Sequence, residues 1–149
     1  MKDSIIRVNE DNYFLFSDMI YWRMTGEQRE ATKCVVNDEI KSELQNSNLY
    51  VYAIQTDNKF VGWISIIYLP KIGKFNGHGH IYIDELWIEP SSRGCGFAKE
   101  LMKKAEEIAE IKSASGIRLY VNAENLAAQN LYKRCGYDNV GTAYFMEKK

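Results

Sequence analysis

Three short segments hold the residues best suited to chemistry. Adjacent carboxylates stand at Asp84-Glu85, a turn with two glycines stands at 93–98, and a stretch with amide side chains and a tyrosine stands at 125–132. Carboxylates and tyrosines can accept or donate protons during a reaction, and a glycine-containing turn before a helix can bind an anion. The sequence therefore indicates an anion site together with candidate proton-transfer groups.

The turn precedes a long helical pattern, and its sequence is Arg93-Gly94-Cys95-Gly96-Phe97-Ala98. The amide N–H groups of a helix's first turn have no partner within the helix, and the helix dipole adds about half a positive charge there. Gly94 and Gly96 let the backbone curl so that successive N–H groups converge on phosphate oxygens, and the small Ala98 leaves room beside the helix. The pattern favours a phosphate-binding turn, although a purely structural turn also explains two glycines before a helix.

Two common nucleotide-binding motifs do not match this turn. The phosphate-binding loop of nucleotide hydrolases requires Gly-Lys-Ser/Thr after the turn, where this chain has Phe97-Ala98-Lys99. The dinucleotide fingerprint G-x-G-x-x-G requires a third glycine at position 99. Both classes of nucleotide site are therefore excluded.

A strand predicted at 80–89 changes the phase of its apolar alternation halfway along. Its alternating apolar residues are Ile81, Ile83, Leu86 and Ile88. A regular strand cannot place all four on one face, but a β-bulge at Asp84-Glu85 can. Bulges are common beside active sites because they redirect backbone and side-chain groups. A strand buried on both faces would explain the pattern without a bulge.

Around these segments, the periodicity predicts a single α/β domain over residues 1–149. Apolar spacings of three and four predict helices, and runs of β-branched and aromatic residues predict strands. In chain order, the predicted elements are a strand at 5–8, a helix from Asp11 to Gly26, a helix around 36–44, a hairpin of strands at 50–54 and 60–67, the strand at 80–89, a helix from Phe97 that ends before Gly116, a strand at 117–121, a helix around 128–135 and a last strand at 143–146.

The bulk composition sets broad limits on partners and location. The net charge is −1 and there is no basic stripe with interleaved aromatic residues, so we expect no nucleic-acid partner. The longest nearly apolar stretch, 60–69, is far shorter than the roughly 20 residues of a membrane helix, so we expect no membrane partner. Three cysteines without a Cys-x-x-Cys pair and the lack of a signal peptide indicate a cytoplasmic protein. His78 and His80 lack a further ligand in register, so we expect no metal.

Two spaced motifs resemble the GNAT superfamily of N-acetyltransferases. Arg93-x-x-Gly96-x-Ala98 matches its Q/R-x-x-G-x-G/A signature, and the segment 125–137 is similar to its N-x-x-A-x-x-L-Y-x-x-x-G-F/Y motif, with Tyr137 for the commoner Phe. Residues 1–49 resemble the family only by the order of their elements. The resemblance implies a mixed, mostly antiparallel sheet of six to seven strands, about four flanking helices, and a bulged and splayed fourth strand.

The resemblance also implies acetyl-coenzyme A (acetyl-CoA) as the acetyl donor. Its pyrophosphate is expected at the 93–98 turn and its pantetheine arm beside the fourth strand, where the bulge would turn the Leu86 amide toward the thioester oxygen. Asn125 can alternatively serve only as a helix N-cap. The residues expected to contact the cofactor are Leu86, Trp87, Ile88, Arg93, Gly94, Cys95, Gly96, Phe97, Ala98, Lys99, Asn125, Asn130 and Tyr132.

For the reaction itself, the resemblance implies two proton-transfer roles. Tyr132 corresponds to the family tyrosine that donates a proton to the departing thiolate, and a core tyrosine is the alternative. Asp84 or Glu85 corresponds to the carboxylate base, and a paired surface carboxylate is the alternative. We favour Glu85, because Asp84 lies nearer the strand body and can anchor a neighbouring loop.

The implied reaction is direct attack of a primary amine on the thioester within a ternary complex. Acidic residues in the first two helical segments favour a small cationic acceptor: Asp18, Glu27, Glu30, Asp38 and Glu39. A protein N-terminus or lysine remains open as the acceptor, and a catalytically silent acyl-CoA-binding sensor remains open as a function. Because the family often dimerises through its C-terminal strands, a homodimer through the apolar segment 144–146 is a further expectation.

Overall fold

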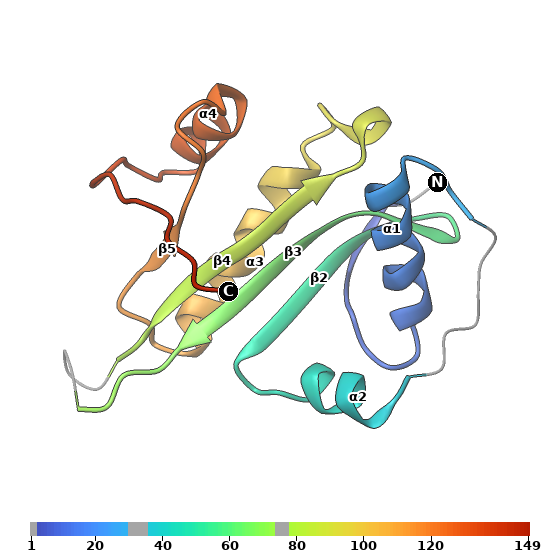
Figure 1. Ribbon diagram of the computed structural model, residues 1–149, viewed down its shortest axis with the longest axis horizontal. Coiled ribbons are helices and arrows are strands. Elements are labelled where there is room, and N and C mark those ends of the chain that lie inside the picture. The colour runs from blue at the N-terminus through green and yellow to red at the C-terminus, as the bar shows by residue number, and fades with distance from the viewer. Residues whose placement is uncertain (1–2, 30–35, 74–77) are drawn as a thin grey trace.

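A five-stranded sheet runs through the computed structural model, which describes residues 3–29, 36–73 and 78–149 (Figure 1). The strands follow one another in space as in sequence: β1 (Ser4–Arg7), β2 (Leu49–Thr56), β3 (Lys59–Leu69), β4 (His80–Ile88) and β5 (Ile117–Leu119). Neighbours are antiparallel except for β4 and β5, which are parallel because a helix crosses over between them. The expected mixed, mostly antiparallel sheet is confirmed.

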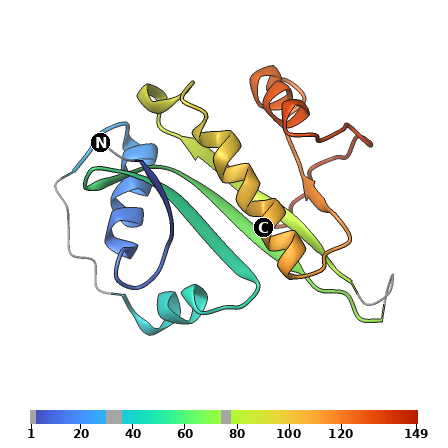
Figure 2. The ribbon, with the colours of Figure 1, turned by 180° about the vertical axis from the view of Figure 1, so that it is seen from behind.

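Four α-helices and a short 3-10 helix surround the sheet in the described part of the chain. They are α1 (Tyr13–Thr25), α2 (Asp38–Leu44), the 3-10 helix η2 (Pro90–Ser92), α3 (Phe97–Ile111) and α4 (Leu126–Arg134). Helix α3 packs on one face of the sheet and α1 on the other (Figures 1 and 2). The expected number of helices is confirmed, and no described helix is long and apolar enough to span a membrane.

Alternating side chains on the central strands build a separate apolar cluster on each face of the sheet. The cluster under α3 contains Ile64 and Ile66 from β3 and Leu101 from α3, and the cluster under α1 contains Trp63 and Met19. All five side chains are almost fully buried. Burial of one large apolar side chain stabilises a fold by about 1.5–3 kcal/mol, so both helices are fixed firmly against the sheet.

A bulge interrupts β4 at the predicted position. Ser65 pairs with Glu85 and Ile66 pairs with Ile83, so Asp84 is an extra residue without a partner on β3. This one-residue shift brings all the alternating apolar residues of β4 into the α3 cluster: Ile81, Ile83, Leu86 and Ile88. The predicted bulge is confirmed.

The predicted hairpin and the limits of the first helix agree with the structure within two residues. Strands β2 and β3 are joined through Asp57 and Asn58. Helix α1 begins at Tyr13 rather than Asp11, because the side chains of Asn9 and Asn12 accept hydrogen bonds from each other's backbone N–H groups just before it. It ends at Gly26 as predicted. Residues 74–77 of the loop after β3, and Glu30 among the acidic candidates, lie outside the described residues.

The expectation of six to seven strands is wrong, since the described residues form five. Residues 138–149, which include the predicted strand at 143–146, form no ladder. A strand requires a neighbour for its backbone hydrogen bonds, and within the described chain the three-residue β5 pairs with β4 alone. The apolar side chains of this segment are therefore exposed, with 96% of Tyr144 and 88% of Phe145 open to solvent.

Candidate active site

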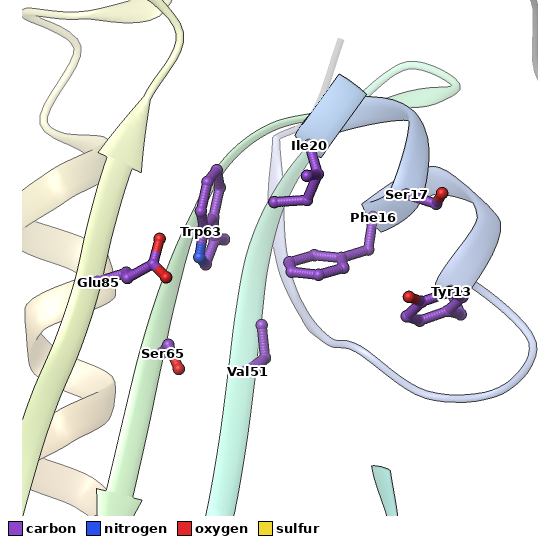
Figure 3. Close-up of a pocket in the computed structure, with 8 residues that line it drawn as sticks. All are labelled: Tyr13, Phe16, Ser17, Ile20, Val51, Trp63, Ser65 and Glu85. Atoms are coloured by element: carbon purple, nitrogen blue, oxygen red, sulfur yellow. The ribbon is translucent and has the colours of Figure 1, made fainter. Parts of the chain in front are cut away.

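A cavity of about 370 Å³ lies between α1 and the sheet (Figure 3). Its lining residues are Tyr13, Phe16, Ser17, Ile20, Val51, Trp63, Ser65 and Glu85. The walls are mainly aromatic and aliphatic, and Glu85 is the one carboxylate among them. A cavity of this size and lining is typical of a site for a small molecule.

Local structure explains why these side chains meet. On α1, Tyr13, Phe16 and Ile20 recur at intervals of three and four residues, so they share one helix face. On the sheet, Ser65 and Glu85 are direct cross-strand partners and therefore point to the same side. Figure 3 shows the α1 side chains and the strand side chains on opposite sides of the cavity.

Glu85 is held at the cavity wall by a cation from α1. Nη1 of Arg23 donates a hydrogen bond of 2.8 Å to Oε2 of Glu85. The Arg23 guanidinium carbon also lies 5.0 Å from the centroid of a Trp63 ring. One cationic group thus contacts both an aromatic wall and the carboxylate of the cavity.

Unlike Glu85, Asp84 lies outside the cavity. It is the unpaired residue of the bulge, it is exposed, and it does not line the cavity. Partial burial, and then the charge of Glu85, raise the pKa of the Asp84 carboxyl above its usual value. No hydrogen bond within the described residues shows Asp84 anchoring a loop. Of the two candidate bases, the structure brings only Glu85 to the cavity.

The predicted anion-binding turn has the backbone geometry that requires glycine. Gly94 and Gly96 both have φ of 82°, a left-handed conformation that other residues adopt only with strain. Gly96 is the N-cap residue of α3, and no side chain at this position caps the first-turn amides. These N–H groups have no partner within the helix, so they can donate to an anion.

A buried carboxylate that the sequence analysis missed supports this turn. Glu89 is 4% exposed and accepts hydrogen bonds from the Ser91 N–H at 3.1 Å and from the hydroxyls of Ser91 and Ser92. Burial alone would raise the pKa of Glu89, but these hydrogen bonds and the charge of Lys59 outweigh burial and lower it. The available signal was Pro90, because proline is common at the first position of a helix and makes Glu89 the residue just before it.

Among the polar side chains of the turn, one is held by a hydrogen bond and two are exposed to solvent. Nε of Arg93 donates a 2.8 Å hydrogen bond to the Ile88 carbonyl, which fixes the arginine to the end of β4. Cys95 and Lys99 are exposed. Arg93 therefore attaches the turn to the end of β4, Glu89 caps the short η2 helix between them, and the exposed Arg93 and Lys99 carry positive charge that an anion can approach.

The second half of β4 has an open side. The parallel ladder with β5 ends at the pair Ile83–Leu119, and in the described residues no strand pairs with Leu86, Trp87 or Ile88 on that side. On its other side, this half of β4 is paired with β3. Its backbone is therefore accessible to a ligand from one edge.

Helix α4 begins with the N-cap that the sequence left as an alternative role for Asn125. The Asn125 side chain accepts a hydrogen bond of 3.1 Å from the Ala128 N–H. Asn130 is exposed, whereas Ala128 lies half-buried. The structure thus gives Asn125 a capping role, while Asn130 is on the exposed side of α4.

Tyr132 lies on the half-buried face of α4. It packs against the α3 cluster, which also includes Leu86 from β4 and Ala98 from the start of α3. Burial, and then the nearby Cys135, raise the pKa of the Tyr132 hydroxyl above its usual value. The tyrosine therefore remains protonated at neutral pH beside the elements expected to hold the cofactor.

A model of the acetyltransferase (GNAT) family matches residues 16–137 of this chain, which is most of its length and includes both the turn and α4. The chain belongs to the GNAT acetyltransferase family. The matched region contains β4, the turn and Tyr132, so the motif resemblance that the sequence showed is confirmed.

Relatives by sequence carry names of amine acetyltransferases. Over its whole length, the chain is 23% identical to a protein named spermine/spermidine N(1)-acetyltransferase from Bacillus subtilis, of which it covers 96%. Over 64 residues, or 43% of this chain, it is 34% identical to a thialysine N-epsilon-acetyltransferase from Bos taurus. That match spans only 38% of the bovine protein.

Solved structures of the GNAT family share the fold. An aminoglycoside N-acetyltransferase in complex with CoA superimposes with a TM-score of 0.77 over 98% of this chain and 99% of its own, at 14% identity. A ribosomal-protein-alanine N-acetyltransferase from Brucella melitensis biovar Abortus superimposes with a TM-score of 0.72 over 99% of this chain and 100% of its own, at 17% identity. At such low identity these likenesses establish the architecture.

Proposed function

We propose that this protein is an acetyl-CoA-dependent N-acetyltransferase that acetylates a primary amine of a small cationic molecule. The observation that carries the proposal is the position of Glu85. It lines an aromatic cavity from the bulged strand β4, and the same strand leads directly into the anion-binding turn. A proton acceptor for the amine and a holder for the acetyl donor thus belong to one continuous segment.

The turn and the open side of β4 offer hydrogen-bond donors and positive charge that suit acetyl-CoA. Its pyrophosphate is anionic, and the left-handed glycines with the uncapped amides of α3 offer N–H donors at a helix start. When bound, it supplies the acetyl group as a reactive thioester. We propose that the contacting residues are Leu86, Trp87, Ile88, Arg93, Gly94, Cys95, Gly96, Phe97, Ala98 and Lys99, with Asn125, Asn130 and Tyr132 from the α4 region.

Glu85 handles the proton of the amine. An aliphatic amine has a pKa of about 10 and is protonated at neutral pH, so it must lose a proton before it can attack a carbonyl carbon. The Glu85 carboxylate at the cavity wall accepts that proton, directly or through a water molecule. Asp84 lies outside the cavity and is left with a minor electrostatic role.

Tyr132 supplies the second proton. A tyrosine hydroxyl is neutral at physiological pH, and burial raises the pKa of Tyr132 further, so it carries the proton that it would donate to the thiolate leaving the acetyl group. The packing of Tyr132 in the same cluster as Leu86 and Ala98 supports this role. The amine is therefore deprotonated from the α1 side of the sheet, and the thiolate is protonated from α4.

The lining of the cavity supports a small cationic acceptor. Aromatic rings and a carboxylate together favour an organic cation, and about 370 Å³ suits a small molecule better than a folded protein surface. The full-length similarity to a protein named for spermine and spermidine supports the same class.

The experiment that tests the function is a CoA-release assay, corrected for hydrolysis without acceptor. The panel contains spermidine, an aminoglycoside, a peptide with a free N-terminus and a lysine peptide. We expect turnover with at least one of the small polycations. Turnover with the peptides alone would identify a protein acetyltransferase. CoA binding without any turnover would instead favour a sensor module and contradict the proposal.

The two neighbouring carboxylates provide a matched pair of variants. We expect Glu85→Gln to slow acetyl transfer by roughly ten- to 10⁴-fold, the usual range for a proton-transfer group, because the amine then lacks its proton acceptor. Asp84→Asn should have a much smaller effect, since Asp84 does not line the cavity. Steady-state kinetics with a saturating donor measure both, and a larger loss in Asp84→Asn would reverse the assignment.

A further inference from the structure

Arg23 extends the cavity-facing stripe of α1 by one more turn. Phe16, Ile20 and Arg23 follow one another at intervals of four and three residues, which places them along one helix face. Phe16 and Ile20 line the cavity, and Arg23 contacts two further lining residues, Trp63 and Glu85. An arginine at the end of this stripe therefore reaches into the acceptor site from its rim.

The contacts of Arg23 are those of a bound organic cation. Its guanidinium lies 5.0 Å from a ring centroid of Trp63, within the range of a cation–π interaction. Its Nη1 donates a charge-assisted hydrogen bond of 2.8 Å to Oε2 of Glu85. An aromatic ring and a carboxylate on one cavity wall are thus already arranged around a positive charge, and the charge comes from the protein itself.

The bond between Arg23 and Glu85 is easily exchanged. Their side chains are 41% and 45% exposed, and exposed ion pairs are weak because water and salt screen them. Arg23 also lies in the last turn of α1, where the helix dipole favours a cation. If Arg23 leaves Glu85, its charge therefore remains in a favourable place near the helix end.

We propose that Trp63 and Glu85 form an organic-cation subsite that Arg23 occupies while the cavity is empty, and that an ammonium group of the acceptor displaces Arg23 from it. Arg23 is then an internal competitor that sets how many positive charges an acceptor needs to enter. A monoamine gains little over the arginine it replaces, whereas a polyamine has further charges with which to compete. This inference rests on the proposed function for the identity of the acceptor cavity.

Binding of tetramethylammonium, without acetyl-CoA, tests the subsite separately from acetyl transfer. This quaternary cation has no N–H and cannot be acetylated, but it can occupy a ring-and-carboxylate site. Removal of the competitor by Arg23→Met should lower the Kd by roughly two- to fivefold, the gain expected when a weak exposed ion pair no longer blocks the site. Isothermal titration calorimetry at low ionic strength measures the change, and Arg23→Gln should give the same shift.

Three further variants serve as controls. Arg23→Lys keeps the charge and should bind tetramethylammonium like the wild type. Arg29→Met should also leave the Kd unchanged, because Arg29 has matching contacts elsewhere, a 2.8 Å bond to Asp18 and a position 4.6 Å from the Tyr21 ring. The double variant Arg23→Met/Glu85→Gln should lose the tighter binding of tetramethylammonium, since the carboxylate that attracts the cation is then missing.

The possible outcomes separate the subsite from the enzymatic function. Unchanged or weaker binding in both Arg23→Met and Arg23→Gln would overturn the subsite, even if the wild type acetylates amines. Tighter binding in these variants together with no acetyl transfer to any amine would support the subsite and refute the proposed function. With an active enzyme, Arg23→Met should lower KM for a monoamine and for spermidine by a similar factor, because both must displace the same arginine.

Discussion

Two half-buried tyrosines, Tyr132 and Tyr137, lie close together near the end of α4. The rings of Tyr132 and Tyr137 lie 6.4 Å apart between centroids, and both pack against the α3 cluster. Burial raises the pKa of each hydroxyl, in Tyr137 to about 12. The Tyr137 hydroxyl is buried without a hydrogen-bond partner in the described part of the chain. Tyr132 is thus the proposed acid, whereas Tyr137 carries a desolvated hydroxyl.

The role of Tyr132 is tested by removing its hydroxyl. We expect Tyr132→Phe to slow acetyl transfer by roughly ten- to 10⁴-fold, because the leaving thiolate loses its proton donor. Single-turnover kinetics with acetyl-CoA bound in advance isolate the chemical step. Tyr137→Phe is the matched control and should keep most of the activity. A wild-type rate in Tyr132→Phe would show that another group protonates the thiolate.

The buried hydroxyl of Tyr137 should lower the stability of the folded protein. Its removal in Tyr137→Phe should increase the free energy of unfolding by about 1 kcal/mol near neutral pH, because a buried hydroxyl without a partner costs about 1–3 kcal/mol. In the wild type, the folded-state pKa is raised from 10.0 to about 12, so the tyrosine ionises more readily in the unfolded state and the wild type loses stability as the pH rises from 10 toward 12. The advantage of the variant should therefore grow over that range.

Urea unfolding at several pH values between 7 and 11 measures this advantage. The variant keeps the ring, so the packing against the α3 cluster changes little. A loss of stability in Tyr137→Phe would mean that the hydroxyl is hydrogen-bonded in solution and would contradict the prediction.

At the scale of single elements, the bulge in β4 determines which of its side chains point to the α1 face of the sheet and which point to the α3 face. With Asp84 as the extra residue, Glu85 points to the α1 side and Leu86 to the α3 side. Leu86 also begins the half of β4 that no strand covers on the β5 side among the described residues. The bulge thus places a side-chain base and a free backbone edge next to each other, which a regular strand offers less readily.

Deletion of Asp84 would remove the bulge while leaving Glu85 on the cavity side, so it separates the role of the bulge from the role of the Glu85 side chain. The pairs Ser65–Glu85 and Ile66–Ile83 would then be consecutive in a regular ladder, and Glu85 would still face the cavity. We expect a folded protein that has lost at least tenfold in turnover, because the amide proposed to contact the thioester oxygen is redirected, and loss of one such donor costs about 10²–10³-fold. Circular dichroism checks the fold and the CoA-release assay checks the rate. Wild-type turnover in the deletion variant would show that the bulge has no catalytic role.

At the scale of the whole molecule, the two proposed binding regions lie on different parts of the sheet. The aromatic cavity is on the α1 face, and the turn proposed to bind an anion leads into α3, which packs on the other face. The described C-terminal segment adds a third feature, since the side chains of Val140, Tyr144, Phe145 and Met146 are each largely exposed. Burial of such apolar side chains against a partner would be favourable, so this segment is suited to a partner surface.

We propose that this C-terminal segment associates two copies of the chain. The wild type should elute with about twice the chain mass of 17.3 kDa in size-exclusion chromatography with light scattering. The double variant Tyr144→Ser/Phe145→Ser should shift toward the monomer, because it removes exposed apolar area that a partner would cover. Ile111→Ser, which alters an exposed apolar residue at the end of α3, should leave the mass unchanged. A monomeric wild type at all concentrations would contradict the proposal.

Much of the fold and part of the site follow from short-range patterns. Helices and strands form where the local apolar period matches their geometry, which is why α1 and the β2–β3 hairpin were predicted within two residues and the start of α3 was predicted at Phe97. Helix α3 ends at Ile111, earlier than the predicted stop at Gly116. The bulge could also be predicted, because a one-residue shift in the alternation of apolar and polar residues along a strand has few structural explanations. The glycines at 94 and 96 require only local backbone geometry, and the family motifs add the expected cofactor.

Other features depend on which segments meet in space, and only the tertiary structure decided them. The sequence favoured Glu85 over Asp84 as the base, but only the fold shows that Glu85 lines the cavity and Asp84 does not. The contact of Arg23 with Glu85 joins residues 62 positions apart, and no local pattern encodes it. The failure of 143–146 to form a strand has the same origin, since a strand depends on a paired neighbour. The sequence alone therefore determined the elements and the chemistry available, and the packing decided which groups work together.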